Sequence, residues 1–221
     1  MSGNREVELK LLLTGGADPD RAHAVLSSWA AERGGTLGAF ASDTHTDRYY
    51  DDPRLSVARA GFGLRLRMGG GQMLAALKSS NPADGGLHAR FELEEPVADD
   101  ATAVDPWPPR VREVLEGLCD VSGLTPLITL TVERHTAELA VAGGIFEVAL
   151  DRVEARQKAT KRTVAWEELE VEAKDGAAVA EAVLAELAAG LAEALEGVPH
   201  NTPKLTTARE RLAQLAAKSV Q

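Results

Sequence analysis

The sequence predicts an α+β chain in which a mainly antiparallel sheet or a closed β-barrel dominates and helices lie at its periphery. Three observations favour this fold class. Charged and apolar residues alternate in several short runs, which is the period of a strand with two unlike faces. These runs follow one another at short, even spacing and are joined by glycine-containing turns, a pattern typical of antiparallel sheets rather than βαβ units. Helical periodicity is confined to a few segments.

The first half of the chain contains most of the alternation. A helix is predicted between Asp18, a plausible N-cap followed by proline, and the stop at Gly34. The three glycines at 69–71 predict a hairpin turn. Strands are predicted around this helix and turn at residues 6–13, 42–51, 63–68, 73–78 and 88–94.

The second half begins with a proline-rich stretch that becomes helical around 111–118. A long Ala/Leu helix is predicted at 176–196, and a final helix starts near Thr202 and Pro203. Further strands are predicted between these helices at residues 127–134, 136–141, 145–153 and 164–172.

Composition narrows the class of protein. The chain has 221 residues without an internal low-complexity linker, so we expect a single domain over residues 1–221. The 34 acidic and 24 basic residues sum to a formal net charge of −10, which argues against a nucleic-acid partner. The single cysteine, Cys119, excludes a disulfide framework and fits a reducing compartment. Neither a signal peptide nor a membrane-length apolar stretch is visible, so we expect a soluble, cytoplasmic protein without a membrane partner.

The charged faces of the strands are the most informative feature. If they point inward, a shared interior holds the cations Lys10, Arg65, Arg67, Lys78, Arg90 and Arg134 and the carboxylates Glu6, Glu8, Glu92, Glu94, Asp151, Glu168, Glu170 and Glu172. Arginine and lysine bind phosphate oxygens, and carboxylates bind hard divalent cations. The alternative is that each charged face is simply solvated, which applies most strongly to the run at 88–94. Repetition weighs against it, because Glu-x-Glu-x-Lys occurs at 6–10 and again at 170–174.

An ordered set of motifs carries a family resemblance. The motifs are EVELK at residues 6–10, the stretch from Tyr49 to Arg67, LAALK ending at Lys78, RFELEE from Arg90, the Arg134 strand, VALDRVEA around Asp151 and ELEVEAKDG from Glu168. Together they resemble the CYTH domain of the triphosphate tunnel metalloenzyme superfamily, collinearly from residue 5 to about 212. The resemblance implies an eight-stranded antiparallel barrel that forms a tunnel, with peripheral helices and a closing C-terminal helix.

The resemblance also implies roles for individual residues. It implies that Mg²⁺ or Mn²⁺ is held by Glu6, Glu8, Asp151, Glu170 and Glu172. It implies that the phosphate chain is held by Lys10, Arg65, Arg67, Lys78, Arg90, Arg134 and Lys204. The residues implied in catalysis itself are Glu6, Glu8, Lys10, Glu170 and Glu172, with Glu92, Glu94 and Glu168 as further tunnel carboxylates.

The activity that this implies is metal-dependent hydrolysis of a small triphosphate or polyphosphate. Inorganic tripolyphosphate is the first choice, because the length, the Ala-rich helix and the Lys-containing closing helix look most like the bacterial triphosphatase subgroup. Thiamine triphosphatase and class IV adenylyl cyclase are alternatives on the same scaffold. A non-catalytic module that binds polyphosphate or nucleotide, and a purely structural barrel, stay open as non-enzymatic readings.

Overall fold

A computed structural model describes residues 7–16, 18–79, 92–98, 103–104, 106–174 and 180–218. Five α-helices, one 3-10 helix and ten strands occur in this part of the chain. In chain order they are β1 (Glu8–Leu13), α1 (Pro19–Ala31), β2 (Thr36–Leu37), β3 (Ala41–Asp51), α2 (Ser56–Arg59), β4 (Phe62–Gly69), β5 (Gln72–Ser79), β6 (Glu92–Val97), α3 (Pro109–Glu116), η2 (Val121–Gly123), β7 (Thr125–Val141), β8 (Gly144–Gln157), β9 (Thr163–Ala173), α4 (Ala180–Ala194), β10 (Gly197–Pro199) and α5 (Lys204–Lys218).

The strands form one sheet in the order β10-β1-β9-β8-β7-β3-β4-β5-β6, with β2 paired to β7. Apart from β2 and β10, which have two and three residues, eight strands remain, and the registers of β1 with β9 and of β3 with β4 are antiparallel. The α+β class and the antiparallel sheet are therefore confirmed. Within the described residues no pairing joins the two ends of the order, β10 and β6, so closure into a barrel is not confirmed.

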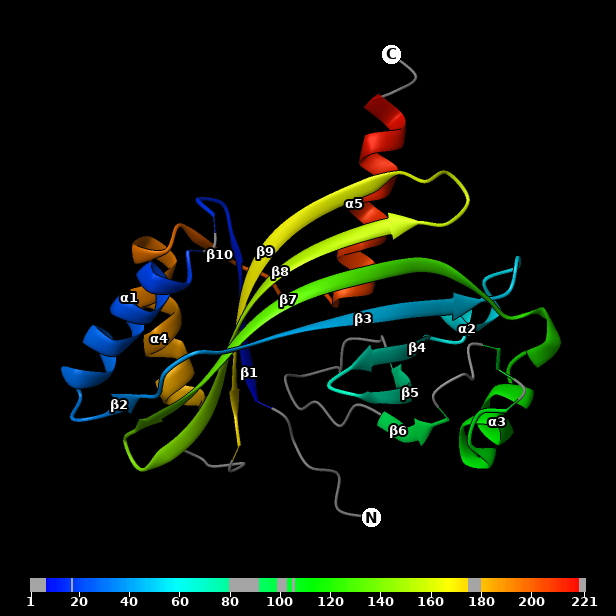
Figure 1. Cartoon of the computed structure of the whole chain (residues 1–221). Helices are drawn as coiled ribbons and strands as arrows, with labels where there is room; N and C mark the ends of the chain where they lie inside the picture. The colour runs from blue at the N-terminus through cyan, green and yellow to red at the C-terminus, as the bar shows by residue number, and fades with distance from the viewer. Residues whose placement is uncertain are drawn as a thin grey trace. The chain divides into compact units, whose positions relative to one another are not determined.

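The chain divides into two compact units. Unit 1 comprises residues 1–43, 133–153 and 165–201, and unit 2 comprises residues 44–132, 154–164 and 202–221. In unit 1, helices α1 and α4 lie side by side and cover one face of the strands (Figure 1). Their core includes Leu26 and Leu187 from the helices and Leu11, Leu169 and Val171 from β1 and β9. This face is built from every second residue of each strand.

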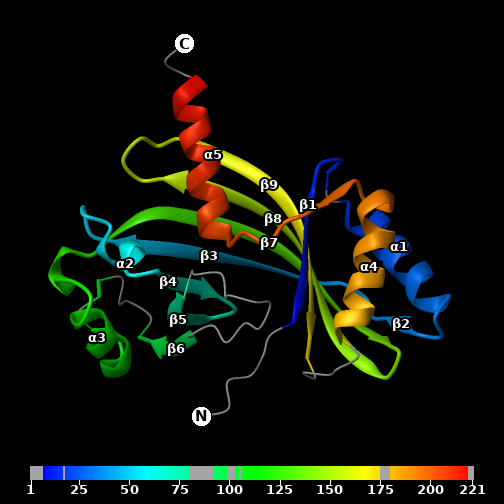
Figure 2. The ribbon, with the colours of Figure 1, turned by 180° about the vertical axis from the view of Figure 1, so that it is seen from behind.

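Unit 2 has a separate core. The strands β4, β5 and β6 follow one another as antiparallel neighbours, with α3 beside them (Figure 2). Leu64 and Leu66 from β4 and Leu77 from β5 pack in this core against Trp107 and against Leu115 of α3. Burial of such side chains contributes about 1.5–3 kcal/mol each.

Local sequence accounts for several boundaries. The Asp18 side chain accepts hydrogen bonds from the backbone N–H groups of Asp20 and Arg21, which caps α1 as predicted. Gly70 and Gly71 have φ values of 58° and 74°, the left-handed conformations that a tight hairpin between β4 and β5 requires. The turn between β7 and β8 uses Ala142 and Gly143 in the same way, with φ values of 52° and 79°.

Some predicted elements differ from the structure. The strands expected at 127–134 and 136–141 form one continuous strand, β7, in which His135 between them is extended like its neighbours. The helix α2 is absent from the prediction, since four residues are too few to show a helical period. The expected strand at 88–94 is described only from Glu92 onward. Among the described residues, no helix is both long and apolar enough to span a bilayer.

Candidate functional site

The register of β1 with β9 sets the charged face of unit 1. Lys10 lies directly opposite Glu170, and Glu8 lies opposite Glu172. Residues opposite one another in an antiparallel pair share a face of the sheet. This face is the reverse of the one that packs on α1 and α4, because Leu9 and Leu11 alternate with Glu8 and Lys10. Lys10 is nevertheless only 8% exposed, so the charged face is not simply solvated at this position.

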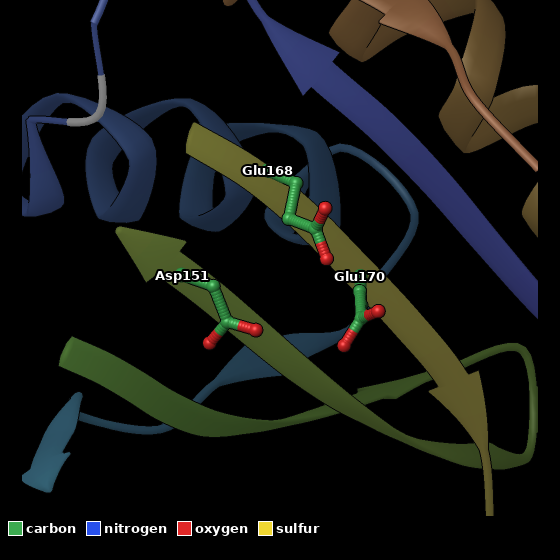
Figure 3. Close-up of side chains that lie close together, drawn as sticks. All are labelled: Asp151, Glu168 and Glu170. Atoms are coloured by element: carbon green, nitrogen blue, oxygen red, sulfur yellow. The ribbon is translucent and has the colours of Figure 1, made fainter. Parts of the chain in front are cut away.

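Three carboxylates meet on this face. Asp151 comes from β8, and Glu168 and Glu170 come from β9 (Figure 3). One oxygen from each lies within 4.8 Å of the others. Asp151 and Glu168 are fully buried, at 0% exposure. We call these three residues the carboxylate cluster.

Two cationic side chains contact the carboxylate cluster. Lys10 Nζ lies 2.6 Å from Oε1 of Glu170 and 3.9 Å from Oε1 of Glu168. Arg134 donates from Nε and Nη2 to both oxygens of Asp151, at 2.7 and 2.6 Å, and from Nη2 to Oε2 of Glu170 at 2.9 Å. Burial disfavours the charge of Arg134, but the hydrogen bonds and charges of Asp151 and Glu170 outweigh burial and raise the pKa of Arg134 above its ordinary value.

Trp166, which is not among the predicted site residues, contacts the carboxylate cluster. Its indole Nε1–H donates to Oε2 of Glu168 at 2.8 Å, and both side chains are buried. Two residues apart on β9, they point to the same face, so strand parity was a signal that could have linked them. A buried carboxylate needs such a donor, because desolvation without hydrogen bonds is costly.

In unit 2, Arg65 and Arg67 contact a carboxylate that the sequence prediction did not include. Asp47 is fully buried and pairs in register with Arg67, as Tyr49 does with Arg65. Arg67 donates from Nε and Nη2 to the two oxygens of Asp47, at 2.8 Å each, and Nη1 of Arg65 lies 3.6 Å from Oδ2. We call Asp47, Arg65 and Arg67 the arginine cluster. His45, to which no role was assigned, lies 3.9 Å from Asp47.

Charge and burial shift the ionisation of this cluster. Burial opposes the charge of Asp47, but the hydrogen bond from Arg67 and the charges of Arg65, Arg67 and His45 outweigh burial and hold the pKa of Asp47 below its ordinary value. Burial, assisted by Asp47, raises the pKa of the Tyr49 hydroxyl, while the charges of Arg65 and Lys204 act in the opposite direction. Lys204, the first residue of α5, is therefore close enough to act on Tyr49.

The other predicted residues take different positions. In unit 2, Glu94 pairs with Arg65 at 3.1 Å, and Glu92 pairs with Lys78, so both carboxylates contact cations. In unit 1, Oε2 of Glu172 lies 3.8 Å from Lys174 Nζ. Glu8 is exposed. The predicted Glu6 and Arg90 lie outside the described residues.

The donor set fits a hard divalent cation. All three ligand atoms that the cluster offers are carboxylate oxygens, which are the ligands that Mg²⁺, Mn²⁺ and Ca²⁺ prefer, whereas zinc sites typically include His nitrogen or Cys sulfur. The buried cluster could therefore hold a metal ion.

Residues 4–196 match the profile of the CYTH domain family. The chain belongs to this family. The CYTH match covers both the carboxylate cluster and the arginine cluster. A comparison with curated protein sequences finds no match.

Solved structures share the CYTH fold at low identity. A candidate adenylate cyclase from Bacillus halodurans is 18% identical with a TM-score of 0.62, over 93% of this chain and 98% of that chain. A candidate adenylyl cyclase from Hippeastrum, which has a dominant triphosphatase activity, is 21% identical with a TM-score of 0.63, over 93% and 95% of the two chains. A candidate adenylate cyclase from Vibrio parahaemolyticus is 16% identical with a TM-score of 0.50, over 93% and 98%. At these identities the likeness shows a common fold.

Proposed function

We propose that this CYTH protein is a metal-dependent triphosphatase that hydrolyses inorganic tripolyphosphate and releases phosphate. The observation that supports the proposal best is the buried carboxylate cluster in contact with Lys10 and Arg134. Phosphoryl transfer needs positioning and neutralisation of charge more than covalent chemistry. A face that carries buried oxygen ligands beside phosphate-binding cations offers both.

The carboxylates would hold Mg²⁺ or Mn²⁺. Asp151, Glu168 and Glu170 offer the oxygens that lie together, and Glu8 and Glu172 oppose each other on the same face. We also assign Glu6 to metal binding, as the CYTH resemblance implies. An ion held there would supply positive charge against the phosphate oxygens and would lower the pKa of a water.

The basic side chains would position the phosphate chain. Arg67 uses Nε and Nη2 for Asp47, so the hydrogens on its Nη1 can donate to phosphate oxygens. Arg65 donates from Nη2 to Oε2 of Glu94 at 3.1 Å, and its Nη1 lies 3.6 Å from Oδ2 of Asp47. Anchoring each guanidinium through a carboxylate reduces the side-chain entropy lost when phosphate binds. The other cations that we assign to phosphate binding are Lys10, Lys78, Arg90, Arg134 and Lys204.

The closed tunnel also belongs to this proposal. We propose that the sheet encloses the phosphate chain as the CYTH resemblance implies, so that charges from several strands act on one substrate. An eight-stranded barrel is just wide enough for side chains and one small ligand.

A phosphate-release assay tests the proposal. Inorganic tripolyphosphate, thiamine triphosphate and ATP are compared in Mg²⁺, in Mn²⁺ and in excess EDTA, with analysis of the products. We expect tripolyphosphate to be the best substrate and EDTA to abolish turnover. Glu170→Gln should lower kcat/KM at least about 100-fold, because even residues that only support a metal ligand typically contribute about 10- to 100-fold. The matched control is Glu167→Gln on the same strand, whose carboxylate pairs with Arg152 instead.

Other outcomes would replace the proposal. Formation of a cyclic nucleotide and pyrophosphate from ATP would identify a cyclase, and preference for thiamine triphosphate would identify a thiamine triphosphatase. Tight binding of tripolyphosphate without phosphate release in Mg²⁺ would identify a binding module. Full turnover in excess EDTA would contradict the role of the metal.

A further inference from the structure

Both oxygens of Asp151 and both oxygens of Glu170 contact a cationic side chain. Arg134 donates to the two Asp151 oxygens and to Oε2 of Glu170, and Lys10 contacts Oε1 of Glu170 at 2.6 Å. In Glu168, Oε2 accepts the Trp166 hydrogen bond and Oε1 lies 3.9 Å from Lys10. The side chains Lys10 and Arg134 therefore already neutralise two of the three negative charges of the carboxylate cluster.

A divalent cation would use the same oxygens. Mg²⁺ binds carboxylate oxygen at about 2.0–2.1 Å. An ion bound to Oε1 of Glu170 would thus lie within about 5 Å of Lys10 Nζ, since that nitrogen is 2.6 Å from the same oxygen. The Lys10 side chain is 9% exposed, so salt screens this repulsion little. The ion and the ammonium group cannot both occupy this face without a large loss of binding free energy.

Lys10 is the less firmly anchored of the two cations. Arg134 is held on Asp151 by a two-pronged pair of hydrogen bonds from a planar guanidinium. Lys10 carries a compact ammonium group on a flexible four-carbon stem, which can turn toward another acceptor. The oxygens of an incoming triphosphate are such acceptors.

We propose that Lys10 occupies the place of the divalent cation in the free protein and leaves it for the phosphate chain, so that metal and triphosphate bind with positive coupling. This inference rests on the proposed function. It adds to that function a movement of Lys10 that couples the binding of metal and triphosphate. The metal alone binds weakly, because Lys10 opposes it. Triphosphate draws Lys10 away and strengthens metal binding, and by linkage the metal strengthens triphosphate binding by the same factor.

Calorimetric titration with Mn²⁺ alone, in the absence of any phosphate compound, tests the inference. Lys10→Met keeps the length of the side chain and removes its charge, so we expect Mn²⁺ to bind at least tenfold more tightly than to the unaltered protein. Arg152→Met is the matched control. It also removes one positive charge, from the residue after Asp151, but on the opposite face of β8, where Arg152 pairs with Glu133 and Glu167. We expect its Mn²⁺ affinity to change less than twofold.

Equal or weaker Mn²⁺ binding by folded Lys10→Met overturns the inference, as does an equal gain in Arg152→Met. If circular dichroism shows that Lys10→Met does not fold, the unaltered protein serves instead. Its Mn²⁺ affinity should rise at least tenfold in saturating imidotriphosphate, a triphosphate analogue with nitrogen bridges, and an unchanged affinity overturns the inference. Absence of phosphate release from every triphosphate overturns the proposed function, whereas equal Mn²⁺ affinities overturn only the role of Lys10.

Discussion

Asp47 stabilises the arginine cluster, and Asp47→Asn measures by how much. The carboxylate is 0% exposed, contacts Arg67 through two hydrogen bonds of 2.8 Å and lies 3.6 Å from Arg65. The amide keeps the shape of the side chain but loses the charge and turns one acceptor into a donor that faces Arg67. Removing one partner of a buried pair typically costs about 3–5 kcal/mol. Because the Arg67 side chain is 26% exposed, water can partly solvate its guanidinium after the substitution, which reduces this cost. We therefore expect a loss of about 3 kcal/mol in the free energy of unfolding.

The pH dependence of this loss has a definite sign. The pKa of Asp47 is lowered in the folded protein, whereas in the unfolded chain it is about 3.9. The charge of Asp47 therefore contributes its full stability above about pH 4, and that stability is lost as pH falls through the lower, folded pKa. The difference between Asp47→Asn and the unaltered protein should be constant from pH 7 to about pH 5 and should narrow below about pH 4.

Urea unfolding followed by circular dichroism, at several values of pH, provides the measurement. Asp43→Asn is the control, because Asp43 lies on the same strand but is exposed, and we expect a change within about 0.5 kcal/mol. A loss at neutral pH no larger in Asp47→Asn than in Asp43→Asn would refute the reasoning. So would a difference that stays the same down to pH 3.

Two further substitutions test the carboxylate cluster and the turn between β7 and β8. Trp166→Phe removes the indole donor from the buried Glu168 carboxylate, so urea unfolding should show a loss of about 2 kcal/mol, and an unchanged midpoint would contradict the role of that hydrogen bond. Ala142→Gly relieves a non-glycine residue with a φ of 52°, so thermal unfolding should show a gain of about 0.5–1 kcal/mol; a loss would show that the turn tolerates alanine without strain.

Alternation predicted the strands well where one face is apolar and the other charged. The runs that became β1, β4 and β9 have this pattern, and their charged residues include Lys10, Arg65 and Glu170. Periodicity could not show whether the charged face is solvated, because a buried face and a wet face have the same period. The burial of Lys10 and Arg65, each 8% exposed, decides the question at these two positions.

Asp47 was not predicted as a site residue, for a different reason. On β3, the run from Ser42 to Arg48 is polar at every position, so neither parity marks an inward face. Tyr49 and Arg65 were within the stretch that resembles the CYTH domain, but their pairing depends on the register of β3 with β4. Register is set by the whole sheet and by the turns, and a single strand does not contain it.

The carboxylate cluster and the arginine cluster both contain an arginine anchored on a buried aspartate. This shared feature is relevant to how the proposed enzyme would bind a polyanion. In each cluster an arginine donates two hydrogen bonds to a fully buried aspartate, Arg134 to Asp151 and Arg67 to Asp47. Both oxygens of each aspartate accept a hydrogen bond from its arginine. The orientation of the guanidinium is therefore fixed before any ligand binds. Lys10 has no such two-pronged anchor, since a lysine ammonium is a point charge. If binding of triphosphate requires one cation to move and the others to stay, this difference in anchoring selects Lys10 as the one that moves.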